Sequence, residues 1–367
     1  MRDNPQLPPF PSAATARKES RPVDAAVADA GEAIRRGKLV GMPTETVYGL
    51  AANALDDRAV ARVFQAKARP SFDPLIVHVN DVEQAGRYAD HWPAAAARLA
   101  DALWPGPLTI VVHKRPATRA DHPAGDLIGD VIGDLVTSGL PSVALRVPRH
   151  PVARALIDAA GVPIAAPSAN RFGRISPTRP EHVVQELGNA VAMVLDGGAC
   201  ETGVESTVVS CTDHREIRVL RLGGVSVERL EEVLGASVTV ATAHSAKHGE
   251  DVRGKASPGM LEKHYAPATP LHVCDRVDAE QCELLRREGF ARIGVLALTA
   301  AERMPKSAVA QRRILSEKGD LTEAAANLFA AMRELDNAEL DVILAERMPQ
   351  RDLGRAINDR LDRASRR

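Results

Sequence analysis

The chain has 367 residues, 45% of them hydrophobic and 26% charged, and its 47 lysines and arginines nearly balance its 48 aspartates and glutamates. This composition is typical of a globular protein, and the length predicts two domains. A formal net charge of -1 excludes a general attraction to polyanions, so a nucleic-acid role would need a local basic groove. The four cysteines show neither a CxxC pair nor metal-ligand spacing with histidine, which predicts reduced thiols in a cytoplasmic protein.

The N-terminal segment, residues 1–21, is rich in proline, serine and alanine and lacks the apolar stretch of a secretory signal, which predicts a disordered tail. A helix is predicted over Val23–Arg36, because Val27, Ala30 and Ile34 fall at helical spacing, and a strand over Leu39–Met42. No later segment has the roughly 18 consecutive apolar residues of a membrane span. We therefore expect no membrane association and a cytoplasmic location.

A polar turn, Gly41–Leu50, follows this first strand. Its small and hydroxylated residues indicate a strand that turns towards a helix, which is where α/β sheets bind ligands. The hydroxyls of Thr44 and Thr46 and the amides near Gly49 could bind a small polar substrate. Threonine and glycine are also ordinary turn residues, so a structural and a functional interpretation stand equal here.

The next helix is predicted to end at Lys67, because Pro70 disfavours further helix, and a strand is predicted over Leu75–Val79. This arrangement brings Lys67, Arg69 and His78 towards one turn. The helix dipole alone favours cations at a helix C-terminus, and a histidine in a half-buried strand is usually part of the core. Taken alone, these residues favour a structural role.

An arginine, Arg146, lies within the apolar run Val143–Pro148, after a long surface loop predicted over residues 114–140. A buried arginine without an anion is costly. Arg146 should therefore face either a carboxylate of the protein or an anionic substrate, and the sequence leaves both alternatives open.

Two further polar turns follow short apolar strands, Pro167–Asn170 and Gly203–Val209, and a third strand ends on Arg221. Small residues let backbone amides approach phosphate oxygens, although the GxxxxGK[ST] pattern of a Walker site is absent. Strand ends that carry hydroxyls, amides and arginines, with few acids or histidines, favour positioning of an anionic nucleotide over covalent catalysis.

A linker is predicted over residues 236–270, where apolar periodicity is weak. Its end, Ser257–Pro267, contains prolines, an aromatic residue and cations, which indicates a lid over the site. After it, strands and helices alternate and predict a small Rossmann-like α/β domain without GxGxxG. The predicted strands are Leu271–Cys274, Ile293–Leu298 and Val342–Ala345, and the predicted helices are Leu321–Leu335 and Gly354–Arg363.

Eight motifs occur along the chain in this order: PTETVYGLAANA, KARPSFDPLIVHV, WPGPLT, VALRVP, PIAAPSAN, SPT, GVESTVV and SPGMLEKHYAP. Over Val23–Pro267 the chain thereby resembles the threonylcarbamoyl-AMP synthase family, whose catalytic unit is the YrdC domain. AANLFAAMRELD, DVILAE and LGRAINDRL are similar to the C-terminal part of its long form. The resemblance implies an α/β fold, with a YrdC-like twisted mixed sheet and a central cleft over residues 22–235 and a Rossmann-like domain over 271–367.

The reaction implied by the resemblance is a nucleotidyl transfer. L-threonine, bicarbonate and ATP, with Mg²⁺, give threonylcarbamoyl-adenylate and pyrophosphate, and the protein itself supplies no metal ligand. A separate tRNA threonylcarbamoyl transferase system then modifies the adenosine beside the anticodon, so weak tRNA contact is an additional expectation.

The resemblance also implies roles for individual residues. The catalytic cations are Lys67 and Arg69. Contacts to L-threonine are expected from Thr44, His78, Arg146 and Ser206. Contacts to ATP are expected from Lys67, Ser71, Ser142, Ser168, Asn170, Ser176, Arg221 and Tyr265.

Two other classes of function need weighing against the synthase. An RNA-binding module is disfavoured by the near-neutral charge and by the 3% aromatic content. A carbamoyl transferase of the hydrogenase-maturation type shares a YrdC-like domain, but that family adds an acylphosphatase-like segment and cysteine-rich zinc fingers, which this sequence lacks.

Overall fold

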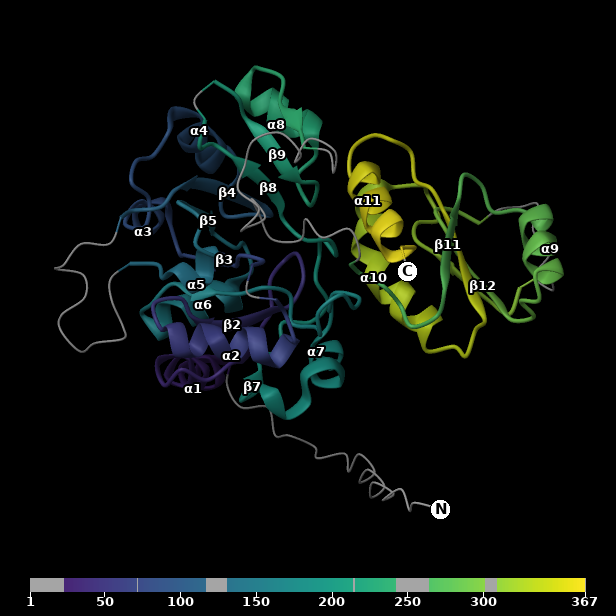
Figure 1. Cartoon of the computed structure of the whole chain (residues 1–367), viewed down its shortest axis with the longest axis horizontal. Coiled ribbons are helices and arrows are strands. Elements are labelled where there is room, and N and C mark those ends of the chain that lie inside the picture. The colour runs from purple at the N-terminus through teal and green to yellow at the C-terminus, as the bar shows by residue number, and fades with distance from the viewer. Residues whose placement is uncertain are drawn as a thin grey trace, which may run out of the picture.

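The computed structural model describes residues 23–70, 72–116, 131–213, 215–241, 264–300 and 309–366. The predicted tail, Ser71, residues 117–130 of the predicted loop and residues 242–263 of the predicted linker lie outside the described residues. Figure 1 shows a larger α/β unit and a smaller C-terminal one, with helices α10 and α11 between the two sheets. No helix in the described ranges is long and apolar enough to cross a bilayer.

The larger unit contains a ten-stranded mixed sheet in the order β10-β9-β8-β4-β5-β3-β6-β2-β1-β7. Pairs such as β3–β5 and β4–β8 are parallel, whereas β4–β5 and β8–β9 are antiparallel. This mixed sheet confirms the predicted fold class. Its strands are β1 Val40–Met42, β2 Gly49–Asn53, β3 Ile76–His78, β4 Leu108–His113, β5 Ser142–Arg146, β6 Ile164–Ala165, β7 Met193–Val194, β8 Thr207–Ser210, β9 Arg218–Arg221 and β10 Thr239–Val240.

Helices cover this sheet, and two of them agree with the sequence patterns, α1 and α2. Asp56 caps α2 by accepting from the amide of Arg58, and Ala68, in the left-handed region at φ 50°, ends the helix directly after Lys67. The helices of the unit are α1 Val23–Arg35, α2 Asp57–Lys67, α3 Val82–Gly86, α4 Ala94–Leu103, α5 Asp134–Thr137, α6 Pro151–Ala160, α7 Pro180–Leu187 and α8 Val227–Leu234, with a 3-10 turn at Gly188–Ala190.

The prediction that the Gly41–Leu50 turn leads into a helix is wrong. The chain reverses after β1 and returns as β2, antiparallel to it, with Met42 paired to Gly49. All five residues of β2 are buried because the strand lies inside the sheet between β1 and β6. Burial on both faces favours a strand of small and apolar residues at the place where the sequence predicted only a turn towards a helix. The predicted loop over 114–140 also contains a short helix, α5.

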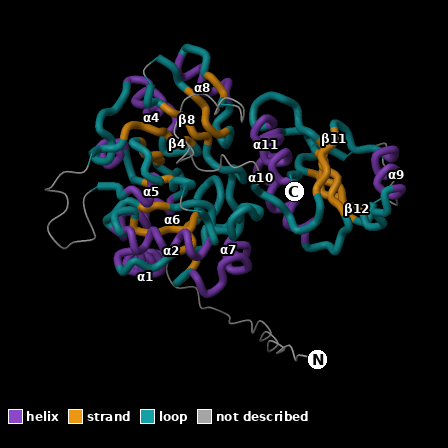
Figure 2. Tube along the Cα trace, in the orientation of Figure 1, coloured by secondary structure: helices purple, strands orange, loops and turns teal. Residues whose placement is uncertain are grey.

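The C-terminal unit is a four-stranded sheet in the order β11-β14-β12-β13, with every pair parallel. Figure 2 shows α10 and α11 on the side of this sheet that faces the larger unit and α9 on the far side. Helices on both faces of a parallel sheet agree with the Rossmann-like prediction. The elements are β11 Leu271–Cys274, α9 Ala279–Arg287, β12 Ile293–Ala297, β13 Gln311–Ile314, α10 Leu321–Asp336, β14 Val342–Glu346 and α11 Gly354–Ala364.

One apolar cluster joins the two units. Val47, Ile175 and Val204 of the larger unit pack in it with residues of α10 and α11, among them Phe329 and Leu361. Contiguous burial of this kind is stabilising in proportion to the apolar area removed from water. The predicted domain boundaries, at 235/236 and 270/271, stay predictions, but the packing brings α10 and α11 against the polar turns of the larger unit.

Candidate active site

A small cavity lies where the polar turns of the large sheet meet the C-terminal unit. Half of its lining consists of residues to which the resemblance assigns a role, drawn from several strand ends. These are Thr44, Arg69, His78, Arg146, Ser168, Ser206, Arg221 and Tyr265. The lining also includes Glu205 and His264, which the sequence analysis did not select.

Two neighbouring strands place His78 and Arg146 side by side. The last residues of β3 and β5 are directly paired in parallel register, so both side chains lie on the same face of the sheet. Arg146 donates from Nη2 to Glu45 Oε1 at 2.8 Å and from Nε to the Gly106 carbonyl at 3.3 Å. The first alternative, a carboxylate of the protein, is thus confirmed. Arg146 also faces the cavity, so its contact with an anionic substrate stays a prediction. Among the described residues nothing accepts from its Nη1, which is available to a ligand.

Glu45 is the carboxylate that holds Arg146, and both side chains are at most 4% exposed. Burial raises the pKa of Glu45, but the charge and hydrogen bond of Arg146 lower it by more, so the pKa lies below its ordinary value. The second carboxylate oxygen accepts from the Arg149 amide at 3.1 Å. Glu45 therefore stays ionised and fixes the guanidinium in the cavity wall.

His78 is an uncharged side chain at neutral pH. Burial, with the positive charge of Arg146, lowers the pKa of His78 to about 3. Its Nδ1 is buried and has no hydrogen-bond partner within the described part of the chain. A neutral imidazole nitrogen of this kind can accept a hydrogen bond from a ligand, or donate one in the other tautomer.

The end of α2 holds the two predicted catalytic cations in different places. Lys67 donates from Nζ to the carbonyls of Ser168 and Asn170, and burial, with the charge of Arg69, holds the pKa of Lys67 well below its usual range. Lys67 faces an adjoining hollow, not the cavity itself. Arg69 lines the cavity and forms an ion pair with Asp73 at 2.9 Å.

The polar turn after β6 is held by its own side chains. Asn170 donates to the carbonyls of Arg171 and Arg174 at 2.8 and 2.9 Å, which fixes the loop, whereas Pro167 and Ser168 of the turn line the cavity. Ser142 begins β5, on the face that carries Arg146 four residues later, but it lies outside the cavity lining. Ser71 is outside the described residues. The roles of Ser142 and Ser71 in ATP binding stay predictions.

The hydroxyl of Thr44 is occupied within its own turn. Thr44 Oγ1 lies 2.8 Å from Thr46 Oγ1, donates to the Val47 carbonyl at 2.6 Å and accepts from the amides of Thr46 and Val47. These bonds shape the turn so that it lines the cavity. The predicted contact to L-threonine would add to this structural role or replace one of its bonds.

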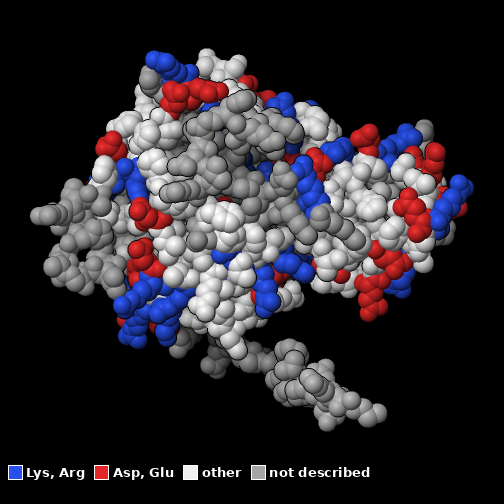
Figure 3. All heavy atoms as spheres, in the orientation of Figure 1, with Lys and Arg blue, Asp and Glu red and all other residues white. Residues whose placement is uncertain are grey.

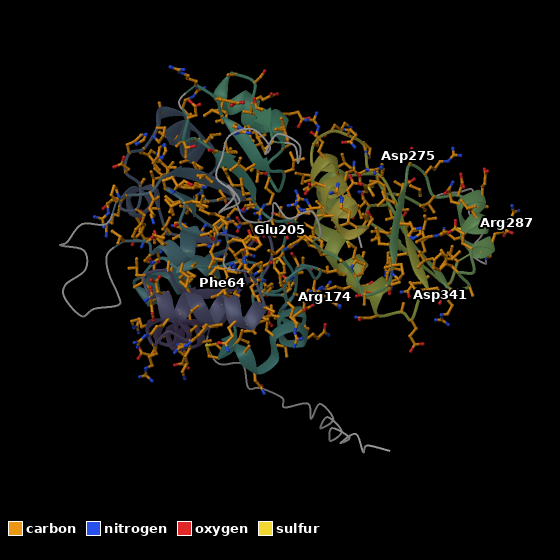
Figure 4. The ribbon with its side chains drawn as sticks, in the orientation of Figure 1. Phe64, Arg174, Glu205, Asp275, Arg287 and Asp341 are labelled. Atoms are coloured by element: carbon orange, nitrogen blue, oxygen red, sulfur yellow. The ribbon has the colours of Figure 1, made fainter. Side chains whose placement is uncertain are left out.

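The turn before β8 carries a linked set of polar groups. Arg221 donates to the Ser206 carbonyl at 2.9 Å and to its hydroxyl at 3.1 Å, and the same hydroxyl lies 2.7 Å from Thr109 Oγ1. Ser176 donates to Glu205 Oε1 at 2.6 Å. Figure 4 places Glu205 at the boundary between the two units, where its carboxylate meets Arg360 of α11.

Tyr265 closes the cavity from the C-terminal side. Its ring is 1% exposed and stacks on Phe329 of α10, with ring centroids 5.4 Å apart, while His264 lies edge-on at 4.1 Å. Burial, with the charge of Glu205, raises the pKa of Tyr265 to about 12, so it is a phenol at neutral pH. This position fits the predicted lid, although residues 257–263 of that segment lie outside the described ranges.

Sequence reasoning missed Glu45, Glu205 and Arg360. For Arg360 a signal existed, because it shares the apolar stripe of α11 with Ile357, Leu361 and Ala364, where a lone cation predicts a buried partner. Glu45 and Glu205 each interrupt a run of small or apolar residues inside a quoted motif. Their pairing partners are far apart in sequence, so the motif alone could not supply them.

Fold and site together define an α/β protein with a cavity lined by buried arginines between its large sheet and a C-terminal unit. A family model described as "Telomere recombination" matches residues 32–223, and one described as "Threonylcarbamoyl-AMP synthase, C-terminal domain" matches residues 225–366. The chain belongs to the threonylcarbamoyl-AMP synthase family. This confirms the resemblance that the motifs indicated.

Curated relatives and a solved structure agree with this assignment over nearly the whole chain. The threonylcarbamoyl-AMP synthase of Bacillus subtilis is 39% identical over 93% of this chain and 93% of its own length. The Pyrococcus abyssi enzyme is 38% identical over 90% of this chain and 92% of its own length. The crystal structure of P. abyssi Sua5 complexed with L-threonine has a TM-score of 0.82 and 37% identity, covering 94% of this chain and 96% of that chain.

Proposed function

We propose that this chain forms threonylcarbamoyl-AMP and pyrophosphate from L-threonine, bicarbonate and ATP, as a nucleotidyltransferase. The observation that carries the proposal is the convergence of three buried arginines, Arg69, Arg146 and Arg221, on one cavity beside an uncharged histidine. Such fixed cations suit a ligand with several negative charges. Membership of the threonylcarbamoyl-AMP synthase family supports this reading.

At the amino-acid end of the cavity, Arg146 binds the carboxylate of L-threonine through Nη1, while Glu45 keeps the guanidinium in place. His78, its neighbour in the sheet, offers a ring nitrogen to the amine or hydroxyl. The L-threonine complex of the P. abyssi relative, at 37% identity, supports L-threonine as the amino acid. One methyl group distinguishes it from serine, which gives only about 10- to 200-fold discrimination.

The chemistry needs positioning and charge neutralisation but no protein nucleophile. The amine of L-threonine and bicarbonate give a carbamate and water. A carbamate oxygen then attacks the α-phosphorus of ATP, the bond to the β-phosphate oxygen breaks, and pyrophosphate leaves. Arg69 and Arg221, which line the cavity, offset the charge on the phosphates, and the turn that contains Ser168 orients the nucleotide. Lys67, which holds the Ser168 carbonyl beside the cavity, would add to this positive charge as the phosphates favour its charged form. Tyr265 and the sheet exclude water, which limits hydrolysis of the mixed anhydride.

Mg²⁺ fits this site as a partner of the substrate. The carboxylates in the cavity lining and next to it, Glu205 and Glu45, both have arginine partners within 3 Å. The protein therefore has little carboxylate capacity to hold a dedicated ion, and Mg²⁺ would enter on the ATP phosphates, as it does in many phosphoryl-transfer sites. When bound, the ion would add positive charge at the phosphate oxygens.

The product is an activated intermediate, from which a separate transferase system would transfer the threonylcarbamoyl group to the adenosine beside the tRNA anticodon. We infer that the chain forms this intermediate in the cytoplasm. Figure 3 shows basic and acidic side chains interspersed on the viewed face, without one continuous basic surface. Together with the formal net charge of -1, this face favours release of the small product to the transferase system over tight tRNA binding, and a weak, salt-sensitive contact with tRNA stays part of the proposal.

Pyrophosphate release by the purified chain tests the proposal. Release should require ATP, L-threonine, bicarbonate and Mg²⁺ together, should stop with EDTA, and should yield threonylcarbamoyl-AMP carrying label from ¹³C-bicarbonate by mass spectrometry. Pyrophosphate release that is indifferent to L-threonine would refute it. In that case, carbamoyl phosphate as co-substrate would test the carbamoyl transferase alternative, and a steep salt dependence of tRNA retention on filters would test the RNA-binding one.

A further inference from the structure

An arginine of the C-terminal unit reaches into the wall of the active site. Arg360 lies on the buried face of α11 and is 0% exposed, the largest of the fully buried side chains in the described ranges. A guanidinium keeps its charge in such a place, and a buried charge is costly unless it is paired and hydrogen-bonded. The contacts of Arg360 therefore identify the groups that compensate its buried charge.

These contacts go to segments of the active site. Nε and Nη2 donate to Glu205 Oε2 at 3.0 and 2.9 Å, and Nη1 donates to the Leu222 carbonyl at 2.6 Å and to Asp359 at 2.9 Å. The guanidinium also lies 5.3 Å from the ring centroid of Tyr265, within cation–π range. One side chain of α11 thus connects the turn before β8, the end of β9 and the residue that closes the cavity.

Glu205 is the carboxylate whose negative charge Arg360 compensates. Its carboxylate lines the cavity, where the substrates bring negative charge, and it carries the Ser176 hydroxyl on its other oxygen. Burial raises the pKa of Glu205, but Arg360, followed by Arg221 and the Ser176 hydrogen bond, lowers it by more. The carboxylate is therefore ionised, and Arg360 is its closest source of positive charge.

A second contact shows that the C-terminal unit is built against this same turn. A Cβ placed on Gly203 would lie 2.4 Å from the Ala325 carbonyl oxygen and from Ala326 Cα of α10, so the two backbones touch there. Arg333 of α10 also donates to the carbonyls of Ile175 and Ser176. The backbone contact at Gly203 and the ion pair of Glu205 thus both fall within three residues of Ser206.

We propose that Arg360 is a positioning residue of the synthase site, through which the C-terminal unit neutralises Glu205 and holds the 203–207 turn ready for ATP and L-threonine. The inference rests on the proposed function. The C-terminal unit is then a component of the active site, and the larger unit without it would carry an uncompensated carboxylate at the place where anionic substrates bind.

Without Arg360, the Glu205 carboxylate can respond in one of two ways, and each would weaken ATP binding. The carboxylate can draw Arg221 away from Ser206, or it can remain unpaired and repel the phosphates. Arg360→Met removes the charge and keeps a long flexible side chain, so packing changes little. We expect kcat/KM for ATP to fall at least about 30-fold at pH 8, in line with loss of a buried charged partner.

A matched control comes from the same helix. Arg355 of α11 also forms an ion pair across the two units, with Glu228 at 3.1 Å, but both side chains are more than one-third exposed and outside the cavity lining. Arg355→Met should stay within about twofold of the wild-type kcat/KM, as exposed pairs contribute little. If the proposal is right, Arg360→Met combined with Glu205→Gln recovers at least about tenfold of the loss, because no buried charge is left unpaired.

The pH profile separates positioning from simple packing. The groups that influence Glu205 are Arg360, Arg221, Tyr265 and Lys67. In wild type the pKa of Glu205 lies below its ordinary value, so its charge is constant from pH 6 to 8. Without Arg360 the effect of burial raises that pKa, so the carboxylate takes up a proton as the pH falls. The defect of Arg360→Met relative to wild type should therefore shrink at pH 6, and should be independent of pH in the double variant.

The proposal is overturned if Arg360→Met keeps the wild-type kcat/KM for ATP, or if its defect is neither relieved by Glu205→Gln nor reduced at pH 6. If Arg360→Met is insoluble, Arg360→Gln keeps a hydrogen-bond donor but loses the charge, and a wild-type kcat/KM for ATP in that variant overturns the proposal equally. Calorimetric titration with ATP needs no turnover. A wild type that binds ATP but releases no pyrophosphate would thus refute the proposed reaction and still allow this test.

Discussion

Gly203→Ala tests whether close backbone contact with the C-terminal unit stabilises the site. Gly203 has φ +71°, and an added Cβ would lie 2.4 Å from two backbone atoms of α10, where no side chain can give way. The left-handed conformation costs a non-glycine residue about 1–2 kcal/mol. Overpacking against a backbone adds about 1–3 kcal/mol, so we expect about 2–5 kcal/mol of lost stability.

Gly161→Ala is the matched control, since Gly161 has φ +67° and no atom within 4 Å of the added Cβ. It carries the conformational cost alone. Guanidinium unfolding followed by circular dichroism gives both free energies of unfolding, and titration with ATP shows whether the site is affected. We expect Gly203→Ala to lose at least about 1 kcal/mol more than Gly161→Ala and to bind ATP more weakly. Equal losses in the two variants would refute the argument that α10 touches the turn tightly.

Three more changes probe the cavity. Arg146→Ala should raise KM for L-threonine at least about 30-fold, because the proposed contact with its carboxylate is lost. Glu45 also loses its buried partner, so Glu45→Gln in the same chain should relieve part of the loss of stability. An unchanged KM would remove Arg146 from the amino-acid site. Tyr265→Ala should weaken ATP binding and turnover and lower the free energy of unfolding by about 3 kcal/mol. Tyr265→Phe keeps the stack on Phe329 and should resemble wild type. Unchanged ATP binding and turnover in Tyr265→Ala would contradict the lid hypothesis. His78 has a folded pKa of about 3, below the unfolded value near 6.5, so the unfolded chain binds more protons in acid: its contribution is present above pH 6.5 and falls by about 2 kcal/mol by pH 5. His78→Gln should flatten this acid limb, and an identical pH dependence of unfolding would contradict the assignment.

Elements with strong local signals were predictable from the sequence. The cap at Asp56, the apolar spacing of α2 and the stop at Pro70 are all local, and the helix lies where they indicate. The strand β2 was missed, because the run is short and its burial requires pairing with β6, which is far away in sequence, as well as with β1. Polar edge elements such as β13, with the sequence QRRI, have no apolar pattern to reveal them.

The residues of the candidate site also differ in how far the sequence predicts them. Residues in polar turns at strand ends were recognisable, and eight of them line one cavity. The acidic partners were not, because Glu45 and Glu205 gain their meaning from Arg146 and Arg360, which are 101 and 155 residues away in sequence. Which residues pair over such separations is decided by the fold. The sequence shows only that a cation in an apolar stripe, such as Arg360, needs a buried partner, and does not show which residue that partner is.

These ion pairs also decide how the site treats its ligands. Five cations, Lys67, Arg69, Arg146, Arg221 and Arg360, face three carboxylates, Glu45, Asp73 and Glu205, in and around the cavity. The carboxylates fix three of the guanidinium groups before any ligand binds, so little reorganisation remains for the reaction itself. The surplus positive charge is modest, because burial, with Arg69 nearby, keeps the pKa of Lys67 well below its usual range. Phosphates beside Lys67 would favour its charged form, so the full surplus arises only together with the anionic substrate. Loss of Arg360 would remove a fixed charge from this balance, which is why a residue of the C-terminal unit should matter for ATP.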